Sequence, residues 1–348
     1  MMSRKLRVPA LFLAASVALL GAGCANGNGG NGNGSANTNG AVTLAKAGNL
    51  EKTILNVTVL PSVDLAGFYV AWHEGLFAQE GLKINYTPAF GDQVIGSMAK
   101  GQYDITGMNY VSYIQAQLNH VAELHIFAEG SLLAPGDQVI MAMPHSRFQS
   151  LPSLKGHVLG VNPDGNIGFL LVESALAQDG ISFLGKKGFS ASSVMFPHDP
   201  NFPFPASPAL VSGKVAAADM TEPFATQLAE QHGAVTIADL DSGATKQFPI
   251  EGYAVTKAWA KANPDTLKAF DTALQAGQEI ADTDRAAVEA AFVALQPGEG
   301  HVDQRTAALM ALNIYPLGFD AVRLQRVADV MQQFGFLEQH FDIAELLN

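Results

Sequence analysis

The spacing of apolar residues changes repeatedly between strand-like and helical patterns from about residue 53 onward. A strand-like run over 54–60 ends at Pro61-Ser62, and apolar residues then recur at helical spacing over 68–76. The same pattern predicts strands over 83–87, 103–108, 124–128, 139–143, 158–161, 215–220 and 252–255, with helices over 94–99 and 167–178. Strands that alternate with helices indicate parallel sheets covered on both faces, so the pattern predicts an α/β fold.

Two helix ends in this pattern are alike. Met98-Ala99-Lys100-Gly101 precedes a predicted strand, and so does Leu210-Val211-Ser212-Gly213, which indicates two lobes built alike. After residue 255 the alternation gives way to helices alone. Asn263-Pro264 is predicted as the N-cap and first residue of one helix, and others are expected over 285–295, 305–312 and 320–334.

The first 23 residues have the pattern of an export signal. Three basic residues precede an apolar run over 8–20, which is shorter than the roughly 20 residues that a membrane-spanning helix needs. Small residues lead to Cys24, and a Gly/Asn-rich segment follows. We therefore expect a signal peptide over 1–23 and a flexible linker over 24–50, because this composition cannot bury enough apolar surface to fold.

Charge, size and cysteine use narrow the class of protein. The chain has 348 residues and a net charge of −12, and removing the basic signal segment makes it more acidic. Such a surface repels nucleic acid, so no nucleic-acid partner is expected. Cys24 is the only cysteine, so stability must come from core burial without intramolecular disulfides. About 300 residues remain after the signal and linker, which favours two domains.

Several short motifs follow one another in an order that is known from one group of transport proteins. They are residues 64–71, Glu74-Gly75-Leu76-Phe77, Glu80-Gly81-Leu82, residues 98–105, Leu154-Lys155-Gly156, residues 210–214, Glu222-Pro223-Phe224 and Asn263-Pro264-Asp265. Over residues 53–336 the chain resembles solute-binding proteins of the nitrate, sulfonate, taurine and thiamine-precursor group. This resemblance implies a two-lobed periplasmic-binding-protein-like (type II) fold of the α/β class with an interlobe ligand cleft.

The resemblance also implies a domain plan and partners. The first lobe would start with 51–140 and be completed by a return strand and C-terminal helices over 249–348, with 141–248 as the second lobe. The crossings between lobes would lie near 139–143 and 249–255. Such proteins capture a small molecule between the lobes and deliver it to an ABC permease and its ATPase, and we expect a monomer.

The segment before Cys24 resembles the bacterial lipobox, in which the cysteine receives lipid such as palmitate. Gly21 occupies the place where that pattern usually has Leu. Lipidation would anchor the exported protein to the membrane, on the outer face of the cell membrane or in the periplasm. The alternative is simple secretion with cleavage nearby.

The ligand site is expected in loops at the carboxyl ends of the strands, where helix N-termini present free N–H groups. These loops are predicted at 61–68, 90–92, 108–111, 162–167 and 219–222. They contain no Lys or Arg but hold acidic, aromatic and amide side chains, which favours a neutral or weakly cationic heterocycle such as a pyrimidine precursor. A sulfonate, taurine or nitrate is the alternative solute. The candidate ligand-binding residues are Asp64, Phe68, Tyr69, Phe90, Asn109, Tyr110, Asn162, Asn166 and Glu222.

Several polar residues in these loops also have a structural interpretation. Asp92 and Asp164 are interpreted as a helix cap and a turn residue. Tyr69 could belong to the core or to the site. Asp64 and Glu222 could contact a ligand or make structural hydrogen bonds, so the sequence leaves both functions open.

The sequence lacks the motifs of an enzyme or a metal centre. Its nine histidines have no tight metal-ligand spacing, and no catalytic residue, cofactor or metal site is predicted. A related fold occurs in a pyrimidine synthase that resembles these binding proteins, but its cysteine-rich motif is absent here. We therefore predict a binding protein and not an enzyme. The alternatives are a ligand-sensing receptor with the same fold or, less favoured, a pyrimidine-synthase-like enzyme.

Overall fold

The computed structural model describes residues 42–44, 48–88, 91, 93–161, 166–181 and 206–348. These residues belong to one compact unit, Val42–Asn348. The predicted signal peptide and Cys24 lie outside the described residues, as do the candidates Phe90 and Asn162 and the acidic residues Asp92 and Asp164. Across the described ranges, no helix combines the length and apolar character that crossing a membrane requires.

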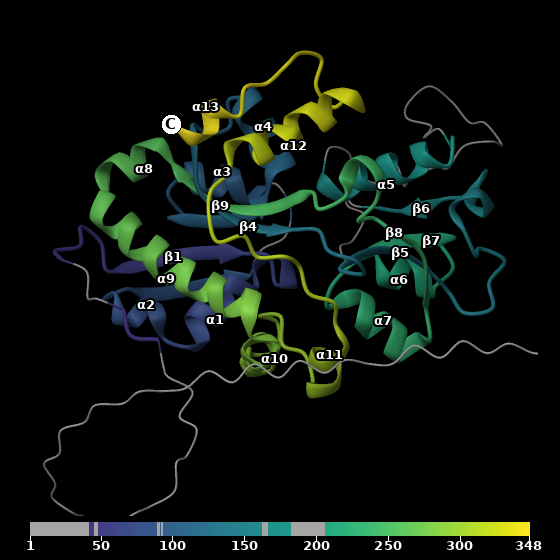
Figure 1. The fold of residues 1–348 in the computed structure, drawn as a ribbon, viewed down its shortest axis with the longest axis horizontal. Coiled ribbons are helices and arrows are strands. Elements are labelled where there is room, and N and C mark those ends of the chain that lie inside the picture. The colour runs from purple at the N-terminus through teal and green to yellow at the C-terminus, as the bar shows by residue number, and fades with distance from the viewer. Residues whose placement is uncertain (1–41, 45–47, 89–90, 92, 162–165, 182–205) are drawn as a thin grey trace, which may run out of the picture. The chain divides into compact units, whose positions relative to one another are not determined.

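One sheet has five strands in the order β2-β1-β3-β9-β4 (Figure 1). Parallel pairing joins β1 to both β2 and β3, whereas β9 lies antiparallel between β3 and β4. The strands are β1 (Ile54–Val59), β2 (Lys83–Pro88), β3 (Ile105–Asn109), β4 (Leu124–Leu132) and β9 (Pro249–Thr256).

A second sheet has four strands in the order β6-β7-β5-β8. Here β6 and β7 are parallel, and β5 lies antiparallel between β7 and β8. The strands are β5 (Gln138–Ala142), β6 (Leu159–Gly160), β7 (Ala217–Thr221) and β8 (Val235–Asp239). The chain leaves the first sheet after β4 and returns to it after β8, so its two crossings fall between β4 and β5 and between β8 and β9.

The prediction of parallel sheets is confirmed for some strand pairs and wrong for others, because both sheets are mixed. The antiparallel members β5 and β9 are the first strands after the two crossings. A strand that enters directly from the other sheet starts at the edge where the parallel strands end. It therefore runs against them, whereas a strand reached through a covering helix returns to the same starting edge.

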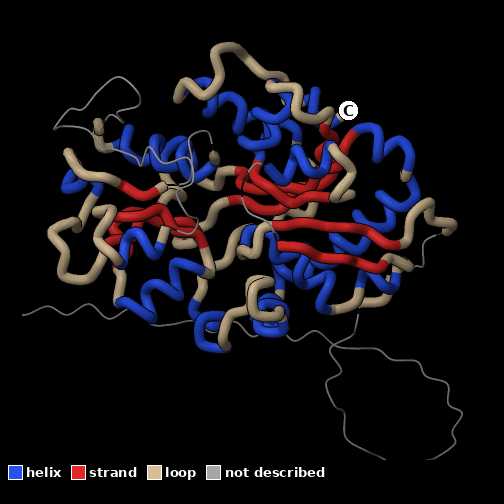
Figure 2. Tube along the Cα trace, turned by 180° about the vertical axis from the view of Figure 1, so that it is seen from behind, coloured by secondary structure: helices blue, strands red, loops and turns tan. Residues whose placement is uncertain are grey.

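Helices cover the two sheets, which form separate groups of strands in Figure 2. The helices up to the second sheet's last strand are α1 (Ala66–His73), α2 (Leu76–Gln79), α3 (Gln93–Ala99), α4 (Tyr110–Leu118), α5 (Ile167–Gln178), α6 (Ser207–Val211) and α7 (Phe224–His232). Those after β9 are α8 (Lys257–Ala262), α9 (Pro264–Thr283), α10 (Arg285–Ala294), α11 (Gln304–Leu309), α12 (Ala321–Gln333) and α13 (Ala344–Leu347). Short 3-10 turns lie at η1 (Val63–Leu65), η2 (Leu151–Leu154) and η3 (Gly243–Thr245).

The repeated glycine ends mark equivalent places in the two sheets. Gly101 follows α3 with φ of 76°, and Gly213 follows α6 with φ of 74°, a backbone conformation that favours glycine. The strands that come next, β3 and β7, each have a parallel neighbour on one side and an antiparallel crossing strand on the other. The local sequence similarity therefore corresponds to a shared position in the topology.

Apolar spacing predicted most elements but missed α2, α4, α7, α8, α13 and β8. The bounds of α5 are confirmed as 167–178, and Pro264 is the first residue of α9. Helix α4 begins directly after β3, so one apolar run continues through both elements and hides the boundary. Strand β8 has no fully buried residue, which removes the apolar alternation that identifies a strand.

The C-terminal helices close the core of the first sheet. In Figure 1, α9 runs alongside α1, while α12 lies near α4. Gly67 and Gly277 allow α1 and α9 to approach closely, because a Cβ atom on Gly277 would overlap the Gly67 carbonyl and lie 2.6 Å from the Ala71 Cβ. The tail is therefore part of the same folded body as the N-terminal strands.

Candidate functional site

The 3-10 turn η1, which follows β1 of the first sheet, makes hydrogen bonds to the second sheet. Asp64 lies in this turn with 3% of its surface exposed, and its Oδ2 accepts hydrogen bonds from the hydroxyls of Ser62 at 2.6 Å and Thr221 at 3.3 Å. Thr221 is the last residue of β7 in the second sheet. The backbone N–H of Val63 also donates to the carbonyl of Glu222 at 3.3 Å. A strand-end loop of one sheet therefore contacts a strand end of the other.

The loop after β7 is fixed by the Glu222 carboxylate. Its oxygens accept from the Thr226 hydroxyl at 2.8 Å, from the Thr226 backbone N–H at 3.0 Å and from the Ala311 backbone N–H at 3.2 Å. The Glu222 backbone N–H donates to the Asp137 carbonyl at 3.0 Å. Glu222 thus links the start of α7, the connection between β4 and β5, and the C-terminal tail.

Asn313 in the C-terminal tail binds two of the acidic residues at once. Its side-chain N–H groups donate to Asp64 Oδ1 at 3.0 Å and to Asp137 Oδ2. The tail is held here by a bridge between Leu132 and Ile314, and the Tyr315 hydroxyl donates to the Val63 carbonyl at 2.8 Å. The C-terminal tail therefore packs against η1, close to the contact between η1 and the end of β7.

Five buried acidic residues meet in this region, and we call them the carboxylate cluster. Each is 5% exposed or less, and in the described part of the chain none of them has a Lys or Arg ion-pair partner. The Gln138 side chain donates to Asp219 at 3.0 Å, which adds a second neutral donor beside Asn313. The members of the carboxylate cluster are Asp64, Asp137, Asp219, Glu222 and Glu251.

Burial shifts the proton affinity of every member of the carboxylate cluster in the same direction. Burial raises the pKa of Asp219 to about 7, and the Asp64 charge acts in the same direction. Burial, together with the Asp64 charge, raises the pKa values of Asp137 and Glu251 well above the ordinary range. The pKa values of Asp64 and Glu222 are also raised by burial, against their hydrogen bonds. The cluster therefore retains protons that exposed carboxylates would lose.

Phe68 and Tyr69 lie in the aromatic core of the first sheet. Phe68 is fully buried, and its ring packs against those of Tyr69, Phe77 and Phe270 at centroid distances between 5.4 and 6.5 Å. The Tyr69 hydroxyl donates to the Leu60 carbonyl at 2.9 Å and lies 2.9 Å from the Tyr86 hydroxyl. Both side chains therefore have packing roles in this structure.

The amide and tyrosine candidates lie at helix starts. Asn109 and Asn166 are the N-caps of α4 and α5, and their side-chain oxygens accept from the backbone N–H groups of Ser112 at 2.9 Å and Gly168 at 3.3 Å. Tyr110, the first residue of α4, is fully buried against Gly252, where an added Cβ would lie 2.6 Å from Tyr110 Cε1. Asn109 also sits opposite Glu251 in the pairing of β3 with β9.

Sequence reasoning gave Asp64 and Glu222 as site candidates but missed Asp137, Glu251 and Asn313. Asp137 precedes β5, Glu251 lies inside β9 and Asn313 belongs to the tail. A charged residue inside an otherwise apolar strand was the available signal for Glu251, because buried carboxylates are rare without a partner. Asn313 has no comparable local signal, since its contacts lie 176 and 249 residues away in the sequence.

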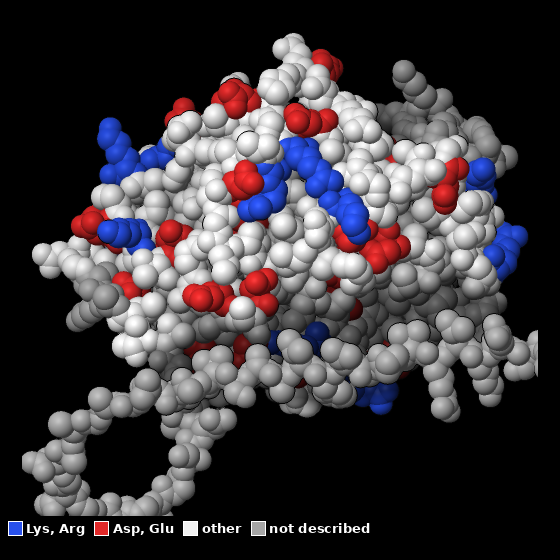
Figure 3. Space-filling view, in the orientation of Figure 1, with Lys and Arg blue, Asp and Glu red and all other residues white. Residues whose placement is uncertain are grey.

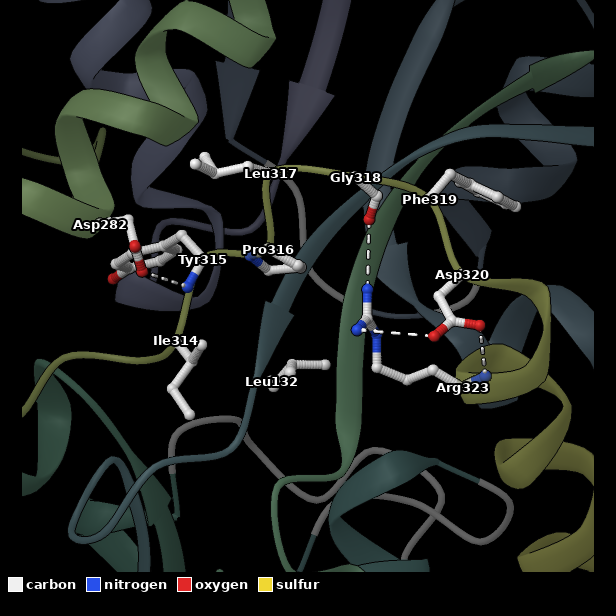
Figure 4. Close-up of a pocket in the computed structure, with 10 residues that line it drawn as sticks. All are labelled: Leu132, Asp282, Ile314, Tyr315, Pro316, Leu317, Gly318, Phe319, Asp320 and Arg323. Carbon is white, nitrogen blue, oxygen red and sulfur yellow. Dashed lines mark hydrogen bonds and ion pairs between the residues drawn. The ribbon is translucent and has the colours of Figure 1, made fainter.

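Three hollows in the described part of the chain have no member of the carboxylate cluster in their lining. One, of about 520 Å³, is lined by the tail segment around Pro316 and by Leu132, Asp282 and Arg323 (Figure 4). Its Arg323 donates to Glu129 at 2.8 and 3.0 Å and to the Gly318 carbonyl at 3.2 Å, so its donors are already engaged. A second, of about 350 Å³, lies between α1 and α10, and a third, of about 400 Å³, has Phe148, His157 and Lys214 in its lining.

Charged side chains on the surface and possible metal ligands are both features that indicate the kind of site. Acidic side chains are scattered over the face seen in Figure 3, and basic side chains form a few separate groups. Within the described ranges, no group of three or more His, Cys, Asp or Glu residues is arranged to hold a metal ion.

Comparison with known proteins identifies the family. Residues 62–285 match the family model described as NMT1/THI5 like, whereas a search of curated proteins gave no significant match. The alkanesulfonate-binding protein SsuA from Xanthomonas axonopodis pv. citri, bound to MOPS, has a similar structure, with 17% identity, 85% of this chain and 98% of that chain covered, and a TM-score of 0.65.

Two further solved structures have the same fold. The nitrate-binding protein NrtA from Synechocystis PCC 6803 is 14% identical, with 86% of each chain covered and a TM-score of 0.65. The ligand-binding component of an ABC-type import system from Staphylococcus aureus, with zinc bound, is 13% identical, with 85% of this chain and 97% of that chain covered and a TM-score of 0.67. The two mixed sheets, their two crossings and the matching family model together show that this chain belongs to the NMT1/THI5-like family and has the periplasmic-binding-protein-like (type II) fold.

Proposed function

We propose that this protein is the extracytoplasmic solute-binding component of an ABC importer. The observation that carries the proposal is the contact between η1 and the end of β7, where Asp64 meets Thr221 and Val63 meets Glu222. These loops belong to different sheets, and the chain connects the sheets at two crossings. A solute held between such loops stabilises the closed arrangement, since it contacts both sides at once.

The proposed site uses strand ends and helix starts from both sheets. Asn109 and Tyr110 begin α4, Asn166 begins α5, and Asp64 and Glu222 follow β1 and β7. We place Asn162 and Phe90 in the same site on the basis of their sequence positions. The solute is a small organic molecule, with a pyrimidine-like heterocycle as the first choice and a sulfonate, taurine or nitrate as the alternative.

Delivery of the solute requires partners outside this chain. We propose that the partners are an ABC permease and its ATPase. We also propose that lipid on Cys24 retains the monomeric binding protein on the outer face of the cell membrane or in the periplasm. The predicted linker of 24–50 is too long at its C-terminal end, because Leu44 and Leu50 already pack against the folded unit that begins at Val42. The part before Val42 would give that unit reach around the anchor. The role requires binding and release alone, so no catalytic step is proposed.

Solution scattering with and without solutes tests this proposal. A thermal-shift panel of pyrimidines, thiamine, taurine, sulfonates and nitrate would first select a ligand, and small-angle scattering would then measure the radius of gyration. We expect the ligand to raise the melting temperature and decrease the radius of gyration, as hinge closure requires. An enzymatic turnover of a panel member without compaction would contradict the proposal.

A further inference from the structure

The carboxylate cluster contains more buried hydrogen-bond acceptors than the described residues can satisfy. Oδ1 of Asp137, Oε2 of Glu251 and Oδ1 of Asn313 have no hydrogen-bond partner among the described residues, although each of these residues is 7% exposed or less. Leaving such buried oxygens unpaired costs about 1 to 3 kcal/mol each, so unpaired groups of this kind call for an explanation.

Glu251 is directed toward the cluster by the register of β9. Alternate residues of β9 face opposite sides of the sheet, and Tyr253, two residues on, donates from its hydroxyl to the Leu65 carbonyl in η1 at 3.5 Å. Glu251 therefore projects from the sheet face that η1 covers, and the Asp64 charge acts on its carboxyl group. Ser131, opposite Glu251 in the pairing of β4 with β9, also has an unpartnered hydroxyl.

The unsatisfied atoms have a common chemical preference. Asp137, Glu251 and Asn313 present oxygens, and the neighbouring Asp64 and Asp219 carboxylates accept from neutral donors alone in the described chain. A group that satisfies several such oxygens must carry several N–H donors. A positive charge on it favours the ionised carboxylates over the protonated forms that burial favours, and it offsets the repulsion between them. An anion would add to that repulsion.

We propose that the solute carries a protonated amine or amidine, and that the carboxylate cluster binds this cationic group through Glu251, Asp219 and Asp64. This inference rests on the proposed function and names the charge class of its solute. An organic cation fits better than a metal ion, because no three His, Cys, Asp or Glu side chains of the described residues are arranged to hold a metal ion. The remainder of the solute would extend toward Asn109 and Tyr110, the other candidates at strand ends.

Matched probes that differ in one group test the charge class. A pyrimidine bearing an aminomethyl group, the same ring bearing a hydroxymethyl group, and the same ring bearing a methanesulfonate group would be titrated calorimetrically at neutral pH. Butylamine, butanol and butanesulfonate form a second, aliphatic series. We expect the amine to bind at least about tenfold more tightly than the alcohol of its series, the size of one charge-assisted hydrogen bond, and the sulfonate to bind weakest.

Variants locate the cationic group. Glu251→Gln and Asp219→Asn keep the side-chain shape but cannot ionise when the cation binds, so each should weaken amine binding about tenfold and change alcohol binding less than twofold. Asp271→Asn is the matched control, because Asp271 in α9 also has a pKa raised by burial but lies outside the cluster. Melting temperatures of all three variants would confirm that they fold.

The outcomes separate this inference from the proposed function. Tight binding and compaction with an alcohol or a sulfonate, and not with an amine, would overturn the cationic class and leave the solute-binding role standing. Equal amine affinity in Glu251→Gln, Asp219→Asn and Asp271→Asn would also overturn it and reassign the cluster to structural hydrogen bonding. A complete absence of binding and compaction with every probe would count against both.

Discussion

The Thr221 hydroxyl donates a hydrogen bond to Asp64 Oδ2 at 3.3 Å, although the two residues lie 157 positions apart in the sequence. Thr221 ends β7 in the second sheet, and Asp64 lies in η1 after β1 in the first. This bond connects the loops that must separate if the two sheets move apart to admit a solute.

Replacing Thr221 by Val should favour the open arrangement of the empty protein. Valine has nearly the shape of threonine but cannot donate to Asp64, and one such hydrogen bond is worth about 1 kcal/mol, or a factor of about five in an equilibrium. Small-angle scattering should show a larger radius of gyration than for the unmodified protein. Thr283→Val is the control, because it loses a hydroxyl bond to the Glu279 carbonyl at the end of α9. Equal radii for the two variants would contradict the role of Thr221.

Replacing Asn313 by Asp should destabilise the fold. The substitution exchanges the N–H donor shared by Asp64 and Asp137 for a third carboxylate, so we expect a loss of about 3 kcal/mol in the free energy of unfolding. Chemical denaturation at neutral pH measures it. Asn119→Asp, at an exposed helix end, should change stability by less than about 1 kcal/mol. A similar effect of the two substitutions would show that Asn313 is not needed to satisfy the carboxylates.

The stability of the empty protein should fall as the pH rises from about 4 to about 7. The pKa of Asp219 is about 7 in the folded protein against 3.8 as its ordinary value, so over this range the unfolded chain loses a proton that the folded protein keeps. The contribution of Asp219 to the free energy of unfolding is therefore fully present below about pH 4 and is lost as the pH rises to about 7. The loss is up to about 4 kcal/mol for this group. The pKa values of Asp64, Asp137, Glu222 and Glu251 are raised too and act in the same direction.

Groups with lowered pKa values act outside this window. Hydrogen bonds to Thr266 hold the pKa of Glu51 at about 2 despite opposing desolvation, so stability from Glu51 is lost only as the pH falls from about 4 toward 2. Melting temperatures measured from pH 4 to pH 8 test the prediction, and Asp219→Asn should flatten the decline. A melting temperature that is constant or rises across this range would contradict the raised pKa values.

Replacing Gly277 by Ala should separate α1 from α9. The added Cβ would overlap the Gly67 carbonyl, and backbone atoms cannot move aside as a side chain can. We expect a loss of about 2 to 3 kcal/mol in the free energy of unfolding, measured by urea denaturation. Gly318→Ala is the control, because no atom lies within 4 Å of its added Cβ. If Gly277→Ala is as stable as Gly318→Ala, the close approach of the two helices is not required.

Replacing Cys24 by Ser should release the protein from the membrane fraction. A serine cannot receive the thioether-linked lipid, so the folded unit would appear in the soluble extracytoplasmic fraction. Mass spectrometry of the mature N-terminus measures the attached lipid directly. An unmodified Cys24 in the natural protein, with cleavage at another position, would show simple secretion instead.

The sequence by itself determined the local elements and the family. Apolar spacing placed α5 and most strands, and glycines with φ near 75° mark the ends of α3 and α6 where the sequence repeats. These features depend on neighbours within a few residues, so the chain reveals them directly. Asp64 and Glu222 could be proposed for the site because each follows a strand that the sequence predicts.

Tertiary structure alone decided the direction of β5 and β9 and the composition of the carboxylate cluster. Strand direction depends on which edge of a sheet the chain enters, and apolar spacing is the same in either direction. Asp137, Glu251 and Asn313 meet Asp64 only because two sheets and the C-terminal tail converge on η1. Burial at that convergence removes water from the carboxylates and raises their pKa values, a property that no local sequence pattern contains.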